Sequence, residues 1–315
     1  MSFRKYCVVA GGNFGDDLNH LLWDQLFPDL ESLSDRIWFY GIGTLLGGRH
    51  DSGAAMRVVM GSGVGGTHRA QPGAGWDFRW VRGPLTAAEF GLPESLALGD
   101  GAILWPELYK GERHPDGPVG LIPHHGTWQS FDWGQVVDRL NQRTPVRLIN
   151  PKQSPLHIRD EIAQCSRVLT ESLHGGIFAD AMGVAWAPCI MAYRFNRFKW
   201  QDWCATIGRD FQPLVLDRPL VNELKPSVAI KHRLIRWIPH ASGRENALRP
   251  VRVARPVDVS KVAEQLLGWV LDPTLFRASP SEQTAAQRER MLTACEAFAR
   301  DYGIRFVRPV DGARD

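Results

Sequence analysis

Short apolar runs that alternate with turn-rich or helix-like stretches constrain the fold of this chain more than any other feature. Strands that alternate with helices are typical of a parallel sheet covered by helices on both faces. Eight runs of this kind lie at residues 6–10, 37–42, 57–60, 78–81, 118–122, 146–149, 168–170 and 185–190. The sequence therefore predicts an α/β fold built on parallel sheets.

A segment dense in glycine, proline and charge, at residues 106–118, separates the first four runs from the last four. The chain has 315 residues, which is long for one average domain and short for three. We therefore expect one lobe in residues 1–110 and a second lobe in residues 111–225. Residues 226–315 are expected to hold a basic segment and C-terminal helices that brace the two lobes.

Capping signals and periodicity together predict two helices. The first follows Asp16 and carries four leucines on one face within residues 18–26. The second is expected to begin at Pro280, with Ser279 as its N-cap, and to end at Gly303.

Composition excludes several classes of protein. The hydrophobic content of 44% and the charged content of 23% match those of soluble globular proteins. No apolar stretch approaches the roughly 18 to 20 residues that span a bilayer, and the N-terminus lacks a signal-peptide pattern, so a cytoplasmic protein is expected. The five cysteines form no C-x-x-C pair, which argues against a disulfide framework or a zinc knuckle.

Positive charge is concentrated in one segment. Residues 231–255 carry seven lysines and arginines against one acid, Glu245, and apolar residues are interleaved at 234–238. An anionic partner, or the anionic inner face of the cell membrane, would attract such a segment. A solvated basic loop, or an amphipathic element packed on the body, accounts for the same pattern, and both interpretations stay open.

The first segment with chemical potential is residues 11–17, between the first run and the first helix. In open α/β sheets ligands bind outside the carboxyl ends of strands, where glycines let them approach the backbone. Asp16 and Asp17 would repel a phosphate, so they fit sugar-hydroxyl binding or general-base chemistry better. The alternative is that both acids only cap the helix.

A second segment, residues 61–66, matches G-x-G-x-x-G after a strand. No recognisable helix follows it, so the dinucleotide-binding pattern lacks its required context. We expect a flexible loop that lines the cleft.

The third segment is residues 168–183, where a buried strand ends at Glu171 and a helix opens around His174. Gly175 and Gly176 leave the first turn of this helix bare, so that its backbone N–H groups could bind an anion. The imidazole can exchange a proton near neutral pH. A core histidine satisfied by hydrogen bonds is the alternative.

Five short motifs resemble, in order and spacing, the polysaccharide pyruvyl transferase family, especially its bacterial exopolysaccharide ketal-forming branch. They are NFGD at 13–16, GIGT at 41–44, RGPLT at 82–86, GDGA at 99–102 and ESLHG at 171–175. The resemblance covers approximately residues 5–205.

This resemblance implies two Rossmann-like lobes in a GT-B-like arrangement, with the active site in the cleft between them. It also implies transfer of pyruvate from phosphoenolpyruvate onto a sugar, as a ketal. By motif position, His174 is expected to be the general acid and Asp16 the base that orients a hydroxyl. Arg82, with the helix end at Gly175 and Gly176, is expected to clamp a phosphate or carboxylate.

The residues around these motifs are expected to contact the substrates. They are Asn13, Gly15, Asp17, Asp100, His124, His125, Glu171, Ser172, Gly175 and Gly176. The pair His124 and His125 has no acidic or cysteine partner at metal-ligand spacing, so substrate contact is favoured over a metal site. The expected partners are phosphoenolpyruvate and a saccharide acceptor, lipid-linked in the reading we favour. No nucleic acid, metal or cofactor is expected.

One position departs from the family pattern. Many members have an arginine two residues before the histidine, where this chain has Ser172. The candidates to replace that cation are Arg194, Arg197 and Lys199. The same side chains could equally be surface charges.

Two other functions stay open. A GT-B glycosyltransferase that uses a nucleotide sugar would share the architecture and a histidine in the cleft. An inactive family member that binds glycan would also fit the Ser172 departure, although Asp16, Arg82 and His174 are retained.

Overall fold

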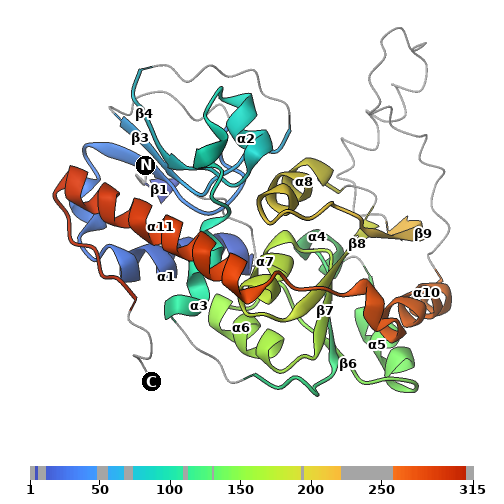
Figure 1. The fold of residues 1–315 in the computed structure, drawn as a ribbon. Helices are drawn as coiled ribbons and strands as arrows, with labels where there is room; N and C mark the ends of the chain where they lie inside the picture. The colour runs from blue at the N-terminus through green and yellow to red at the C-terminus, as the bar shows by residue number, and fades with distance from the viewer. Residues whose placement is uncertain are drawn as a thin grey trace, which may run out of the picture.

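The computed structural model describes residues 4–5, 12–47, 56–66, 74–108, 113–129, 131–192, 195–220 and 258–309. Within these ranges the chain forms two parallel sheets, each flanked by helices (Figure 1). The first sheet has the order β1 (Arg4–Lys5), β2 (Ile37–Tyr40), β3 (Met56–Met60), β4 (Trp76–Trp80). The second has the order β6 (Val146–Leu148), β5 (Val119–Ile122), β7 (Arg167–Thr170), β8 (Ala185–Ala192), β9 (Leu214–Leu220). The predicted α/β fold with two parallel-sheet lobes is confirmed.

The helices lie where the chain crosses between parallel strands. In the first lobe they are α1 (Phe14–Leu26), α2 (Pro84–Glu89), α3 (Trp105–Leu108) and the 3₁₀ turn η3 (Gly101–Leu104). In the second they are α4 (His125–Trp128), α5 (Trp133–Asn141), α6 (Pro155–Ala163), α7 (Leu173–Ala181) and α8 (Arg197–Thr206). The chain continues with α10 (Val259–Leu271) and α11 (Ser281–Tyr302).

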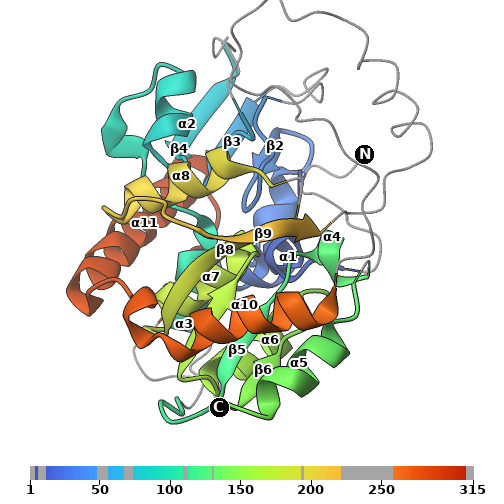
Figure 2. The same ribbon diagram turned by 90° about the vertical axis from the view of Figure 1, so that its right-hand side faces the viewer.

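The C-terminal helices return to both lobes. Helix α10 packs on α5 and β9 of the second lobe, whereas α11 packs on β4 and η3 of the first (Figures 1 and 2). The expectation that the C-terminal helices brace the lobes is confirmed for this part of the chain. The basic segment at residues 231–255 lies outside the described residues. None of the described helices is long and apolar enough to cross a membrane.

Two local expectations are corrected. The run at 6–10 lies outside the described residues, and the other seven runs match strands β2 to β8, but strand β9 was not expected. It is an edge strand whose residues are mostly exposed or half-buried, and Asp217 and Arg218 interrupt its apolar character. Helix α11 begins at Ser281 and not at Pro280. Ser279 is not its cap, because Pro280 occupies the N-cap position and no side chain makes a cap hydrogen bond. Gly303, with φ of +70°, ends the helix as predicted.

The second sheet has a topological switch point between β5 and β7. The chain passes from β5 to β6 on one side and later to β7 on the other, where β7 pairs with β5 along its length. In open α/β sheets the crevice at the carboxyl ends of such strands is the usual ligand site. Here it receives the loops that begin at Pro123 and Glu171.

One hydrophobic cluster joins the two lobes. It combines side chains of α1 and η3 with side chains of α6, α7 and α8. At its centre the rings of Phe14 and Phe178 meet edge-on, with their centres 5.0 Å apart. This packing places the start of α1 beside the start of α7, so motifs separated by more than a hundred residues share one site.

Candidate active site

Glu171, just after β7, ties the start of α4 to the carboxyl end of β8. Its Oε2 accepts hydrogen bonds from the His124 backbone N–H at 3.1 Å and from the Thr127 hydroxyl at 2.8 Å. Its Oε1 accepts from the backbone N–H groups of Met191 and Ala192, at 2.8 and 2.5 Å. Burial raises the pKa of Glu171, and these bonds oppose the rise. Glu171 therefore positions the loops at the switch point, while its contact with substrate stays a prediction.

His174 lies against the first turn of α1. All residues of α7 are buried, as expected for a helix that is mostly apolar on every side. A Cβ atom at Gly15 would lie 1.7 Å from Nδ1 of His174, so only glycine leaves room for the imidazole. Phe14 contacts the same ring edge-on, with ring centres 6.2 Å apart. The NFGD motif of the first lobe is therefore shaped around the histidine of the second.

Asp16 and Asp17 are neighbours in α1 with different surroundings. Asp17 Oδ2 accepts a hydrogen bond from the Asn13 backbone N–H at 3.0 Å, at the start of the helix. Asp16 is buried, and its Oδ2 accepts a 2.5 Å hydrogen bond from the Asn13 side-chain amide. Burial raises the pKa of Asp16, while His174 and the Asn13 hydrogen bond oppose the rise. A role limited to capping fits Asp17 and does not fit Asp16.

Asp100 meets His174 from the first lobe. Its Oδ1 accepts a hydrogen bond from the Ala102 N–H at 3.0 Å, which fixes the carboxylate at the start of η3. Its Oδ2 lies 3.7 Å from Nε2 of His174. Both of these atoms are buried without a hydrogen-bond partner in the part of the chain that the structure describes. Such atoms are rare and call for a functional partner or an ordered water.

His124 and His125 lie together after β5, with ring centres 4.1 Å apart. Nδ1 of His124 accepts a hydrogen bond from the Gly126 N–H at 3.1 Å, so in a neutral ring Nε2 carries the proton. Burial, and then the charge of Lys199, lower the pKa of both rings, that of His124 strongly. Both are neutral near pH 7. No group of three metal-ligating side chains occurs within the described ranges. Substrate contact by this pair stays a prediction.

Gly175 and Gly176 allow close packing around α7. A Cβ atom at Gly175 would lie 2.5 Å from Thr170 Oγ1, and one at Gly176 would lie 3.2 Å from the Trp200 ring. The Gly176 N–H donates to the Ser172 carbonyl at 3.2 Å. Packing therefore explains both glycines, and anion binding at this helix end stays a prediction.

The guanidinium of Arg82 has several partners inside the protein. Its Nε donates to Asp202 at 3.1 Å, Nη1 to the Thr44 hydroxyl at 3.0 Å and Nη2 to the Val64 carbonyl at 2.6 Å. The side chain is fully buried. Arg82 therefore ties the first lobe to α8, and its role as a clamp for a substrate anion stays a prediction.

The G-x-G-x-x-G segment is a packed turn after β3. Residues 61–64 are buried, and the Gly63 N–H donates to the Gly43 carbonyl at 3.0 Å. A Cβ atom at Gly63 would lie 2.4 Å from the Arg82 guanidinium carbon. The expectation of a flexible loop is wrong for residues 61–64, because these contacts hold them in place.

The candidates for a replacement cation differ in their surroundings. Lys199 is half-buried on α8, and its charge acts on Asp16, whereas Arg197 is exposed. Arg194 lies outside the described residues. Ser172 itself is buried, and its N–H donates to the Thr170 hydroxyl at 3.0 Å.

Asp202 was not expected from the sequence. It is fully buried, and besides Arg82 it accepts hydrogen bonds from the Thr86 N–H at 2.9 Å and the Thr86 hydroxyl at 2.6 Å. The sequence offered one sign of this role, the position of Asp202 between Trp200 and Trp203. A charged residue in an apolar surrounding is usually paired.

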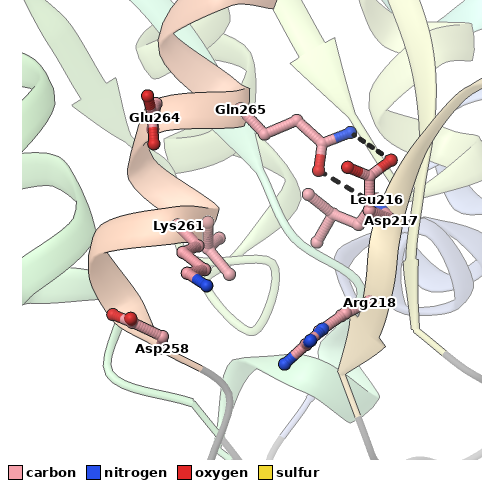
Figure 3. A pocket seen from close by; sticks show the side chains of 8 residues that line it. Leu216, Asp217, Arg218, Asp258, Lys261, Glu264 and Gln265 are labelled. Atoms are coloured by element: carbon pink, nitrogen blue, oxygen red, sulfur yellow. Dashed lines mark hydrogen bonds between the residues drawn. The ribbon is translucent and has the colours of Figure 1, made fainter.

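A separate pocket of about 390 Å³ lies between β9 and α10 (Figure 3). Its lining residues are Leu216, Asp217, Arg218, Asp258, Lys261, Val262, Glu264 and Gln265. None of them belongs to the cluster around His174. Acidic and basic side chains alternate around this pocket, so neither charge predominates in its lining. The pocket therefore does not define the chemistry of the candidate site.

Two parallel-sheet lobes, with acids and histidines gathered where the strands end, define a two-lobed α/β protein with a candidate active site where the lobes meet. Residues 1–190 match the polysaccharide pyruvyl transferase family. The chain belongs to this family, as the five motifs predicted.

A named relative extends the comparison. The chain is 34% identical over 213 residues to the succinoglycan biosynthesis protein ExoV of Rhizobium meliloti (strain 1021). The matched region spans 66% of this chain and 66% of the relative, just under two thirds of that protein. No solved structure matches the chain at a significant level.

Proposed function

We propose that this protein transfers pyruvate from phosphoenolpyruvate onto a sugar of an exopolysaccharide, or of its lipid-linked repeat unit, as a ketal. Family membership supports the reaction class, and the name of the Rhizobium meliloti relative supports an exopolysaccharide as the acceptor. The observation that carries the proposal is the pair of buried, unpartnered atoms, Nε2 of His174 and Oδ2 of Asp100, 3.7 Å apart and from different lobes.

The reaction needs one proton donor and two nucleophilic hydroxyls. A proton is added to the methylene carbon of phosphoenolpyruvate, and the central carbon becomes cationic. Two sugar hydroxyls attack that carbon in turn, and the C–O bond to phosphate breaks. The hydroxyls release two protons, of which one replaces the proton added to carbon and the other leaves with phosphate.

The site can supply these proton transfers. His174 gives its proton to the methylene carbon, and Asp100 stabilises the protonated imidazole from the other lobe. Asp16, which is buried near the same histidine, accepts a hydroxyl proton. Burial at the joined lobes excludes water, which would otherwise compete with the sugar for the cationic intermediate.

Gly15→Ala tests the fit between the NFGD motif and His174. The added methyl would overlap the imidazole, so the ring must move, and a displacement of about 1 Å costs roughly a hundredfold in rate. Initial rates and melting temperatures should be measured together. Gly268→Ala in α10 is the control, since nothing lies within 4 Å of its added Cβ atom. A folded Gly15→Ala protein with the wild-type rate would contradict the assigned position of His174.

Asp16→Asn tests whether Asp16 is the base, through the pH dependence of the rate. The pKa of Asp16 is raised above the ordinary 3.8 by burial, so the rate should fall on acidification at a higher pH than for an exposed aspartate. The variant should lose about a hundredfold in rate at neutral pH. A carboxyl group whose pKa is higher in the folded than in the unfolded state destabilises the fold at any pH above both pKa values. The variant lacks this group, so it should melt a few degrees higher at pH 7. A pH profile that keeps its acid limb in the variant would contradict the role of Asp16.

The proposed reaction is tested directly with purified protein, phosphoenolpyruvate and candidate lipid-linked oligosaccharides. Acceptor-dependent release of phosphate, together with a ketal methyl signal in the NMR spectrum of the product, is the expected result. A protein that ignores phosphoenolpyruvate in calorimetric titration but binds a nucleotide sugar would overturn the proposal.

A further inference from the structure

One face of α8 is turned toward the first lobe. Asn196, Lys199, Asp202 and Thr206 follow one another at spacings of three or four residues, which places them along one side of the helix. The Asn196 amide donates to the Gly65 carbonyl at 2.8 Å. Asp202 pairs with Arg82 at 3.1 Å, and the Thr206 hydroxyl donates to the Arg82 carbonyl at 2.9 Å.

Lys199 lies between these contacts. It is half-buried, and it sits one turn from Asn196 and one turn from Asp202. Burial is the main influence on the pKa values of Asp16, His124 and His125, and the charge of Lys199 acts on all three as well. These three groups come from α1 and from the loop after β5. Lys199 shares the face of α8 that contacts the first lobe, so it lies where the two lobes meet.

An anionic donor could bind among the acidic groups of the site only if a cation compensates their charge. Asp16, Asp100 and Glu171 are buried acids, while the buried guanidinium of Arg82 is paired with Asp202. Phosphoenolpyruvate carries a phosphate and a carboxylate, which buried acids would repel. Ser172 supplies no charge at the position next to α7.

We infer that Lys199 binds an anionic group of the donor and supplies, from α8, the positive charge that Ser172 does not. This inference rests on the proposed function and adds a donor-binding residue to it. Lysine suits this task because its ammonium binds phosphate or carboxylate oxygens as a compact charge on a flexible stem. Since α8 also carries Asp202, the cation is positioned by the same helix that holds the lobes together.

The test compares Lys199→Ala, Lys199→Gln and Lys199→Arg with the control Arg139→Ala, which removes an exposed cation from α5. Calorimetric Kd for phosphoenolpyruvate, KM and kcat should be measured, with melting temperature as the check on folding. Removing the charge is expected to raise Kd by about tenfold to a hundredfold. Lys199→Arg should retain most of the affinity, and Arg139→Ala should stay within about twofold.

Separate titrations with inorganic phosphate and with pyruvate identify the anionic group. The ligand whose affinity falls in Lys199→Gln is the one that Lys199 contacts. Unchanged Kd for phosphoenolpyruvate in both folded Lys199→Ala and Lys199→Gln would overturn the inference while leaving pyruvyl transfer intact. Wild-type protein that binds no phosphoenolpyruvate would instead refute the proposed function.

Discussion

Replacing His174 with asparagine is expected to lower kcat by about a hundredfold or more. Asparagine keeps a similar bulk against Gly15 and some hydrogen bonding, but it cannot give a proton to carbon near neutral pH. Affinity for phosphoenolpyruvate should change much less, because the substitution removes the proton transfer to carbon and leaves the donor-binding contacts in place. Steady-state kinetics and calorimetry on the same preparation measure both quantities.

The Lys199→Ala variant provides the comparison for His174→Asn. That variant should weaken donor binding and turnover together, whereas His174→Asn should separate them. The melting temperature of each variant controls for misfolding. A His174→Asn protein that retains wild-type kcat would remove His174 from the chemistry and leave Asp100 without an explanation for its unpartnered oxygen.

Replacing Asp202 with alanine is expected to reduce the free energy of unfolding by about 3–5 kcal/mol, the usual cost of leaving a buried charge without its partner. The variant leaves Nε of Arg82 and two donors of Thr86 without their acceptor. The lobes should also lose contact through α8. Urea or thermal unfolding at pH 7 measures the change.

A double-mutant cycle isolates the ion pair. Asp202→Ala in an Arg82→Ala background should cost less than it does alone, because no buried charge is then left unpaired. Asp138→Ala, which removes an exposed carboxylate from α5, is the matched control and should change stability by less than about 0.5 kcal/mol. Equal losses for Asp202→Ala and Asp138→Ala would show that the ion pair does not hold the lobes.

The central strands β5 and β7 of the second sheet were predictable because they are buried on both faces. A parallel strand covered by helices is apolar along its length, so residues 119–122 and 167–170 stand out in the sequence. Strand β9 escaped notice because it is an edge strand with exposed charged residues. The start of α11 was misplaced because Ser279 satisfies a capping pattern, yet Pro280 takes the N-cap position and the helix begins at Ser281.

The motifs predicted which candidate side chains come together, but not what each of them contacts. The motifs indicate Asp16, Asp100 and His174, and the structure places these three side chains together. Local sequence does not reveal that Asp17 contacts the Asn13 backbone at the helix start while Asp16 turns inward. It does not show the occupied oxygens of Glu171 either, since their partners come from two other segments, the start of α4 and the end of β8.

The alternation of strand and helix, the family and the residue types available for chemistry could all be predicted from the sequence. These follow from local periodicity and from short motifs. The packing of α8 against the first lobe pairs Arg82 with Asp202, 120 positions away, and it leaves Lys199 half-buried while Arg197 is exposed. The physical reason is that pairing and burial depend on how α8 packs against another lobe, and no local pattern in α8 encodes the partner it meets.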